Sequence, residues 1–148
     1  LSLIGSTLQG RRLLLVEDND LNAEIAATIL EGDDAYVSIV GDGAQAVEAF
    51  AANPAGTFDA ILMDVVMPKM DGLAATRAIR ALDRPDAATI PIIAMTANAF
   101  SDDVQNSIAA GMDAHISKPI AFGILYQNLV EQMRRKGLEE GRSDVGTA

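Results

Sequence analysis

The amino-acid sequence predicts an α/β domain built as a doubly wound, five-stranded parallel sheet with helices on both faces. Five short apolar runs alternate with segments in which apolar residues recur at helical spacing, a pattern typical of repeated strand–helix units. Three of the runs are apolar throughout, as expected for strands that helices cover on both faces. Right-handed crossovers then distribute the helices over the two faces of a single sheet.

Each predicted strand is followed by a segment with helical periodicity. The strands are Leu13–Val16, Tyr36–Val40, Ala60–Met63, Ile92–Met95 and Ala114–Ser117. The apolar positions that mark the helices after them are, in chain order, Leu21, Ile25 and Ile29; Ala46, Val47 and Phe50; Ala75, Ile79 and Leu82; Val104 and Ile108; and Leu125, Leu129 and Met133. Spacings of three and four residues place such side chains on one side of a helix. The pair Asp71-Gly72 is typical of a turn that starts a helix.

The chain of 148 residues is long enough for one domain, since domains commonly take about 100–200 residues. We expect this domain over residues 11–136. Residues 1–10 are interpreted as a linker or flexible N-terminus, and residues 137–148 as a flexible C-terminal tail, because both are rich in small and polar residues. The chain begins with Leu1 rather than Met, which suggests a piece of a longer protein.

Composition excludes several functional classes. The chain has no cysteine, which rules out thiol catalysis, cysteine-ligated zinc and iron–sulfur clusters, and one histidine, His115, cannot form a multi-histidine metal site. The net charge of -10 repels nucleic acids and anionic membranes, so direct binding to either is not expected. No apolar run approaches the roughly 18 residues of a membrane span, and the N-terminus does not resemble a signal peptide.

Polar side chains follow four of the predicted strands, at the edge where open α/β sheets bind their ligands. Glu17 and Asp18 follow the first strand, Asp64 the third, Thr96 the fourth and Lys118 the fifth. Converging carboxylates repel one another unless a cation lies among them, and hard oxygen ligands favour Mg²⁺. A lysine and a hydroxyl group opposite them suit a phosphoryl group. The set therefore indicates phosphoryl transfer to a carboxylate, with Asp64 on the central strand as the best placed nucleophile.

Taken singly, these residues also have structural explanations. Asp18 lies where a helix begins and could cap it, as could Asn19, and Thr96 could cap the following helix. Lys118 alone would be an ordinary surface lysine. Asp64 differs, because a lone acid within an apolar segment costs stability unless it has a partner.

These segments resemble the receiver domain of two-component response regulators. The matching stretches are Leu13–Asn19, Ile61–Gly72, Pro91–Ala99, Ala110–Asp113 and Ser117–Ile120. They follow one another in receiver-like order and cover about residues 11–136. Asn22, together with Thr96–Ala99 and Ala110–Asp113, is most similar to receivers attached to hybrid sensor histidine kinases, so a piece of a hybrid kinase is the expected context.

The resemblance implies a flavodoxin-like strand order 2-1-3-4-5 and assigns roles to the site residues. Asp64 is the expected phosphoacceptor. Asp18 and Asp64 are expected to bind Mg²⁺ directly, Glu17 through water, and Val66 through its backbone carbonyl. Lys118 and Thr96 are expected to bind phosphoryl oxygens. Flanking positions at the phosphoryl site are Val66, Ala97 and Asn98.

One position departs from the family pattern. Three residues before the lysine, receivers usually carry Tyr or Phe as a switch residue, and this chain carries His115. An imidazole that swings inward behind Thr96 would make the output pH-sensitive, because histidine changes charge near neutral pH. We state this as a hypothesis, which an unchanged pH profile of signalling in His115→Phe would contradict.

The resemblance implies a cytoplasmic phosphorelay receiver domain without membrane contact of its own, although the full-length protein can still be membrane-tethered. A histidine kinase or histidine phosphotransfer protein would donate the phosphoryl group, and the surface around the fourth helix, fifth strand and fifth helix would switch. The domain would catalyse its own phosphorylation and dephosphorylation, which leaves its status as an enzyme open.

The sequence bears on four other functions. A haloacid-dehalogenase-type phosphatase requires a second aspartate two residues after the nucleophile, where this chain has Val66. A flavodoxin-like cofactor binder or an NTPase requires a glycine-rich phosphate loop, and no such loop follows the first strand. A degenerate receiver that binds proteins without phosphorylation stays open as the alternative, although degenerate receivers usually lose the acid pair, the acceptor or the lysine.

Overall fold

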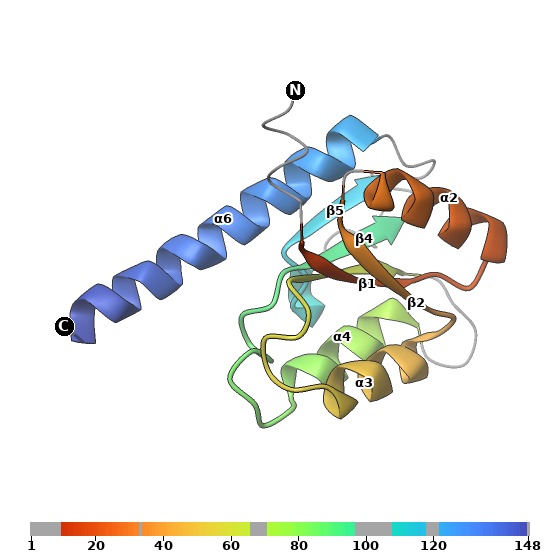
Figure 1. The fold of residues 1–148 in the computed structure, drawn as a ribbon. Coiled ribbons are helices and arrows are strands. Elements are labelled where there is room, and N and C mark those ends of the chain that lie inside the picture. Colours follow the sequence, from red (N-terminus) through yellow and green to blue (C-terminus); the bar gives the residue numbers. More distant parts are fainter. Residues whose placement is uncertain (1–9, 33, 66–70, 97–107, 118–121, 148) are drawn as a thin grey trace.

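The computed structural model describes residues 10–32, 34–65, 71–96, 108–117 and 122–147. Its centre is a parallel sheet with the strand order β2-β1-β3-β4-β5 (Figure 1). The strands are β1 Arg12–Val16, β2 Tyr36–Val40, β3 Ala60–Asp64, β4 Ile92–Thr96 and β5 Ala114–Ser117. This confirms the predicted fold class and strand order. β2 lies on one side of β1, whereas β3 and the later strands lie on the other. The strand order therefore reverses between β1 and β3, and the carboxyl ends of these two strands form the topological switch point of the sheet.

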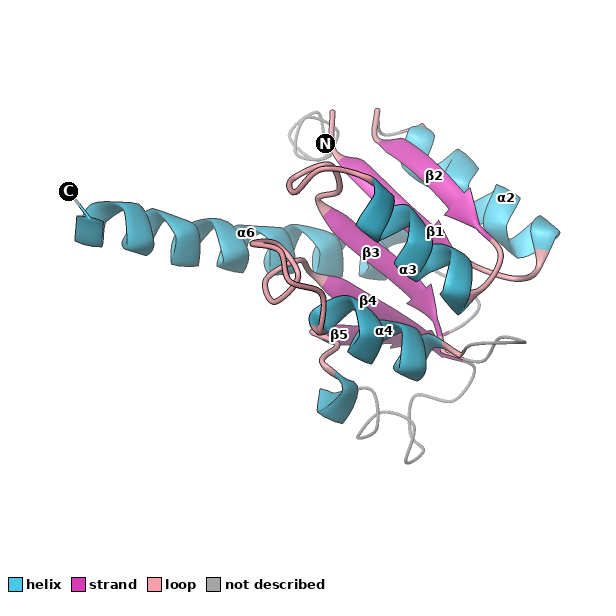
Figure 2. Ribbon diagram, turned by 90° about the horizontal axis from the view of Figure 1, so that it is seen from below, coloured by secondary structure: helices cyan, strands magenta, loops and turns pink. Residues whose placement is uncertain are grey.

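Helices cover both faces of the sheet, as predicted. Within the described residues they are α2 Asp20–Glu31, α3 Gly43–Ala52, α4 Gly72–Arg80 and α6 Phe122–Thr147. Val104, which marks the helix predicted between the fourth and fifth strands, lies outside the described residues, so that helix stays a prediction. Figure 2 shows α3 and α4 on one face and α2 and α6 on the other. Successive residues of a strand point to opposite faces, so β1 sends Leu13 and Leu15 into the core under α2 and α6, and Leu14 and Val16 into the core under α3 and α4. All four side chains are fully buried.

The face that α2 buries is not the one marked by the apolar residues from which the helix was predicted. Leu21 is 65% exposed and Ile25 is 51% exposed, while the buried side chains of α2 are Ala23, Ala26, Ala27 and Leu30. Small alanine side chains allow a helix to lie close to a sheet, so the alanine face packs inward. The larger apolar residues are consequently left at the surface.

The C-terminal helix continues beyond the expected domain boundary. α6 extends to Thr147 and projects past the sheet (Figures 1 and 2). The domain boundary at residue 136 and the flexible tail over residues 137–148 stay predictions. No proline interrupts residues 137–147, and extending an existing helix costs much less than starting one. Among the described residues, no helix combines the length and the apolar character needed to cross a membrane. Residues 1–9 lie outside the described residues, so the proposed N-terminal linker stays a prediction.

Glycine at position 72 allows α4 to approach the acceptor strand closely. The backbone N–H of Gly72 donates a hydrogen bond to the carbonyl of Val65 at 3.0 Å. A Cβ atom on Gly72 would lie 2.2 Å from the carbonyl oxygen of Asp64, which is far inside van der Waals contact. The side chain of Asp71 caps the helix by accepting from the N–H of Ala74 at 2.8 Å. This confirms the predicted helix start at Asp71-Gly72.

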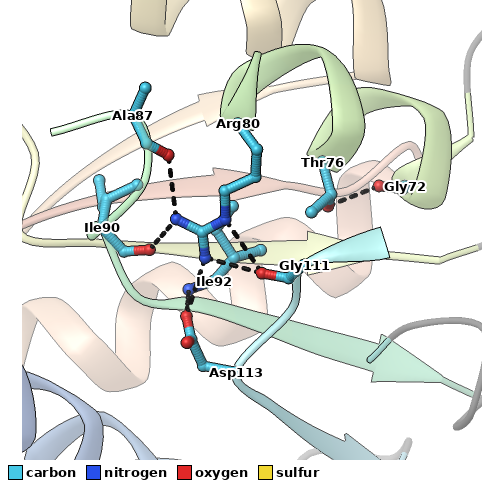
Figure 3. A network of polar contacts seen from close by, with 8 residues as sticks. All are labelled: Gly72, Thr76, Arg80, Ala87, Ile90, Ile92, Gly111 and Asp113. Atoms are coloured by element: carbon cyan, nitrogen blue, oxygen red, sulfur yellow. Dashed lines mark hydrogen bonds and ion pairs between the residues drawn. The ribbon is translucent and has the colours of Figure 1, made fainter. Parts of the chain in front are cut away.

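Two arginines form hydrogen bonds with loops at the amino ends of the strands. The guanidinium of Arg80 donates to the carbonyls of Ala87 (3.1 Å), Ile90 (2.8 Å) and Gly111 (3.0 and 2.8 Å), and to the carboxylate of Asp113 (3.0 Å; Figure 3). Burial lowers the pKa of the Arg80 guanidinium from its ordinary value, while the adjacent Asp113 acts in the opposite direction. The guanidinium stays charged, because arginine is not deprotonated in proteins.

The second arginine, Arg84, joins α3 to the loop before β4. It donates to the carboxylate of Asp86 at 2.6 Å and 3.2 Å and to the carbonyl of Phe50, and its guanidinium carbon lies 4.2 Å from the centre of the Phe50 ring. Asp86 also accepts from the N–H of Gly56 at 3.0 Å. Burial alone would raise the pKa of the Asp86 carboxyl, but these hydrogen bonds outweigh burial and lower it.

We expect Gly72→Ala to lower the free energy of unfolding by roughly 1–3 kcal/mol, because the added methyl group would collide with the Asp64 carbonyl. Gly123→Ala is the matched control, since a Cβ atom there meets nothing within 4 Å. That change should leave stability unchanged or raise it by up to about 1 kcal/mol. Urea unfolding of both variants measures the difference. Equal effects at the two positions would contradict the close approach.

We expect the stability that Asp86 contributes to depend on pH. The pKa of Asp86 in the folded state lies below the ordinary 3.8, so its ionised form stabilises the protein at higher pH and this contribution disappears as the pH falls through the folded-state pKa. Asp86→Asn should therefore be less stable than the unchanged protein at neutral pH and equally stable in strong acid. Urea titrations from about pH 7 down to about pH 1 measure this. A difference that does not shrink with acid would contradict the assignment.

Candidate functional site

Three carboxylates meet at the carboxyl ends of β1 and β3. Glu17 and Asp18 directly follow β1, and Asp64 is the last residue of β3. One carboxylate oxygen from each residue lies within 4.8 Å of the other two. Asp18 is exposed, while Glu17 is 4% exposed and Asp64 is 3% exposed. The predicted acidic cluster is therefore present, at the topological switch point of the sheet.

Strand register explains this convergence. β1 and β3 are parallel neighbours, with Val16 paired to Met63, so the residues that follow in each strand, Glu17 and Asp64, come next to each other. The N–H of Glu17 donates to the carbonyl of Val40 at 3.1 Å, which extends the ladder to β2 by one residue beyond β1. The backbone at Glu17 is consequently fixed by the sheet.

Helix capping does not account for Asp18. The side chain of Asn19 caps α2 by accepting from the N–H of Asn22 at 2.9 Å. The N–H of Asn19 itself donates to the carboxylate of Glu17 at 3.3 Å. Since Asn19 performs the structural task that was an alternative explanation for Asp18, the place of Asp18 in the cluster supports a functional role for its carboxylate.

The donor set of the cluster fits a hard divalent cation. Three negative charges at this separation repel one another, and two of them are buried, where water screens charge poorly. A cation among them would offset this repulsion. The donors are all carboxylate oxygens, which Mg²⁺ prefers and which softer metals do not require.

Thr96 lies on β4, which neighbours β3, and His115 lies on β5, the next strand outward. Thr96 is the buried last residue of β4, directly after Met95, which pairs with Asp64. His115 is half-buried on β5 and pairs with Ala94; Met95 then pairs with Ile116, and Thr96 pairs with Ser117. Paired residues of parallel strands share a face, so His115 lies on the same side of the sheet as Ala94 and Thr96. This placement is the one required of a residue behind Thr96.

Several predicted site residues cannot be placed. Val66, Ala97, Asn98 and Lys118 lie outside the described residues, so their roles stay predictions. Two features adjoining the site were not predicted. One is the close approach of Gly72 to Asp64, and the other is the exposure of Leu21 and Ile25 on the helix that follows Asp18. The Asp71-Gly72 pair marks the helix start in the sequence but carries no sign of the contact with Asp64.

A family model described as the response regulator receiver domain matches residues 13–130. Hybrid signal transduction histidine kinase I from Dictyostelium discoideum is 36% identical over 141 residues, which cover 94% of this chain and 8% of that protein. Probable histidine kinase 1 from Oryza sativa subsp. indica is 35% identical over 153 residues, covering 84% of this chain and 15% of that protein. Sensor protein GacS from Pseudomonas syringae pv. syringae is 40% identical over 121 residues, covering 80% and 13%. The chain thus spans a small part of the length of these relatives.

Solved structures agree in fold. The receiver domain of a sensor histidine kinase from Pseudomonas aeruginosa, which holds a magnesium ion in its active site cleft, superposes with a TM-score of 0.75 at 39% identity. The alignment covers 84% of this chain and 98% of that one. The signal receiver domain of a histidine kinase from Syntrophus aciditrophicus gives a TM-score of 0.74 at 32% identity, covering 84% and 91%.

The sheet topology, the acidic cluster at its switch point and the family match over most of the chain agree with one another. The chain belongs to the response regulator receiver domain family, and its relatives include hybrid histidine kinases.

Proposed function

We propose that this domain accepts a phosphoryl group from a phosphohistidine-bearing protein onto Asp64, in a Mg²⁺-dependent reaction, and that phosphorylation changes the surface around β5 and α6. The observation that carries the proposal is the position of Asp64. It ends the central strand and is almost fully buried, and one of its carboxylate oxygens lies within 4.8 Å of a carboxylate oxygen of Glu17 and of Asp18. Membership in the receiver family supports the same role.

In this proposal Asp18 and Asp64 would bind Mg²⁺ directly, Glu17 would bind it through water, and the backbone carbonyl of Val66 would complete the protein ligands. When bound, Mg²⁺ supplies positive charge that offsets both the carboxylates and the incoming phosphoryl oxygens. The magnesium ion in the Pseudomonas aeruginosa receiver supports this assignment.

The chemistry is an in-line displacement at phosphorus. A carboxylate oxygen of Asp64 forms a bond to phosphorus while the phosphorus–nitrogen bond of the phosphohistidine breaks, and the departing imidazole keeps the electron pair and takes a proton from solvent. The product is an acyl phosphate on Asp64. The domain contributes position and charge, which is most of what phosphoryl transfer requires. Water later attacks the phosphorus, the phosphorus–oxygen bond to Asp64 breaks, and inorganic phosphate leaves while the carboxylate is restored.

Lys118 and the hydroxyl of Thr96 bind the phosphoryl oxygens in this scheme. The burial of Thr96 at the end of β4 supports its part, because a fixed hydroxyl loses little freedom on binding. Val66, Ala97 and Asn98 flank the phosphoryl group and affect its rate of hydrolysis. As Thr96 and Lys118 respond to the new negative charge, His115 and the surface formed by β5 and α6 shift between two arrangements.

The exposed face of α2 is the proposed docking surface for the phosphohistidine donor. α2 begins two residues after Asp18, so its first turns adjoin the acidic cluster. Leu21 and Ile25 are exposed one turn apart, and the exposed acids Asp20 and Glu24 lie beside them. An apolar pair with an acidic margin fits a helix that presents apolar side chains flanked by basic ones.

We expect incubation with acetyl phosphate and Mg²⁺ to add one phosphoryl group to the unchanged protein, measured by intact-mass spectrometry. A chelator should abolish the addition, because without the cation the carboxylates of the cluster repel the incoming phosphate dianion. Asp64→Asn should also abolish it. Asp83→Asn, which changes an exposed aspartate away from the cluster, should have no effect.

Phosphorylation that persists in Asp64→Asn, or that does not need Mg²⁺, would contradict the proposed mechanism. A folded protein that accepts no phosphoryl group from acetyl phosphate or from a phosphohistidine protein would instead support the degenerate receiver, which acts by binding alone.

We expect Leu21→Ala and Ile25→Ala to slow phosphoryl transfer from a phosphohistidine protein by about 5- to 30-fold each, as loss of an apolar anchor does at an interface. Both should leave the rate with acetyl phosphate unchanged, because that donor needs no docking surface. Ile39→Ala is a matched control, since Ile39 is 48% exposed on β2. Equal losses with both donors, or an equal loss in the control, would contradict docking on α2.

A further inference from the structure

A second group of polar residues joins β4 and β5 at the ends opposite the acidic cluster. We call it the Arg80–Asp113 node, and it consists of Arg80, Gly111, Asp113 and Ile92. Asp113 directly precedes β5, and Ile92 begins β4. The N–H of Asp113 donates to the carbonyl of Ile92 at 2.8 Å, and the carboxylate of Asp113 accepts from the N–H of Ile92 at 2.9 Å. Both backbone polar groups of Ile92 are therefore bound to Asp113.

Arg80 fixes this junction from the end of α4. Its guanidinium reaches the carbonyl of Gly111 through two nitrogens and the carboxylate of Asp113 through one of these, while its third nitrogen binds the loop before β4 (Figure 3). The planar guanidinium sets the direction of each bond, which a lysine ammonium cannot do. Gly111 has φ +110°, and a Cβ atom there would lie 3.1 Å from the Cγ of Arg80. The loop before β5 is thus held by Arg80 in a conformation that suits glycine.

α4 connects the node to the acceptor. Its first residue, Gly72, packs against the backbone carbonyl of Asp64, and its last residue is Arg80. The hydroxyl of Thr76, buried midway along the helix, donates to the carbonyl of Gly72 at 2.7 Å. A nine-residue helix spans about 13 Å, so one short rigid element contacts both the acceptor strand and the starting ends of β4 and β5.

β5 therefore has two different ends. Its amino end is fixed to β4 by the node, whereas its carboxyl end, Ser117, pairs with Thr96, the proposed phosphoryl ligand. His115 lies two residues from Asp113 and two residues from Ser117. If the amino end of a strand is fixed, a force at its carboxyl end rotates the strand about the fixed end. If the amino end is free to move, the same force displaces the whole strand.

We infer that the Arg80–Asp113 node is the pivot that converts phosphorylation of Asp64 into a movement of β5 and His115. The inference rests on the proposed function. Arg80 is in this sense a positioning residue, because it acts through β5 and touches none of the carboxylates of the acidic cluster in the contacts described above. With the node intact, the response of Thr96 to the phosphoryl group rotates the carboxyl half of β5. Without the node, the amino end of β5 also moves, and the carboxyl half of the strand rotates less.

The test compares Arg80→Lys with Arg84→Lys. Arg84 is a matched control, because it is also a partly buried arginine that binds a carboxylate and a carbonyl at the same end of the sheet, but it contacts the loop before β4 and α3 rather than β5. Each variant is phosphorylated with acetyl phosphate and Mg²⁺, and the mass confirms the modification. Amide hydrogen exchange over residues 114–117 is then measured before and after phosphorylation, together with the thermal unfolding midpoint.

Both variants should unfold at lower temperature and both should still be phosphorylated. In Arg80→Lys alone, the phosphorylation-dependent change in the exchange rate of residues 114–117 should become smaller by about threefold or more. Mutations along a coupling network have effects of this size. If Arg80→Lys does not fold, Asp113→Asn replaces it, since an amide oxygen can still accept from Ile92 while the ion pair with Arg80 is lost.

A full exchange response in Arg80→Lys, or an equal loss in Arg84→Lys, would overturn the pivot and leave the proposed function intact. Absence of phosphorylation in the unchanged protein with both acetyl phosphate and a phosphohistidine protein would overturn the proposed function, and the pivot with it. The two failures are therefore distinguishable by mass before any exchange is measured.

Discussion

The site depends on one electrostatic constraint, the holding of three carboxylates within 4.8 Å of one another against their mutual repulsion. Hydrophobic packing supplies the opposing free energy. The residues of β1 from Leu13 to Val16 are fully buried between helices on two faces, and β3 is buried along its whole length. A shift of one residue in either strand would turn every apolar side chain to the opposite face, so the register is fixed strongly enough to keep the acids together.

Fold class and acidic cluster were both predictable from the sequence, because each depends on local patterns. Apolar runs of four or five residues give the strands, helical spacing gives the elements between them, and parallel topology brings the residues after each strand to one edge. The orientation of α2 was not predictable in this way. Leu21 and Ile25 indicate a helix as well as Ala23 and Ala26 do, and only the sheet decides which stripe packs inward.

Contacts between distant parts of the chain could not be predicted from local sequence patterns. Arg80 meets Gly111 and Asp113 across more than thirty positions, and the segment Ala110–Asp113 could be recognised as family-like without showing what its glycine and aspartate do. The same holds for Gly72, whose contact with Asp64 depends on how α4 meets the sheet. The helical course of residues 137–147 went unpredicted because glycines there favour a break, while an established helix continues at low cost.

The length of α6 gives the domain mechanical leverage. The helix has 26 residues and is about 39 Å long, whereas the strands beneath its first half span only about 15 Å. A rotation of about 10° where α6 meets β5 would carry its far end through several ångströms, because displacement grows in proportion to distance from the fulcrum. A small rearrangement at the edge of the sheet would thereby become a larger displacement at Thr147, the end of the helix.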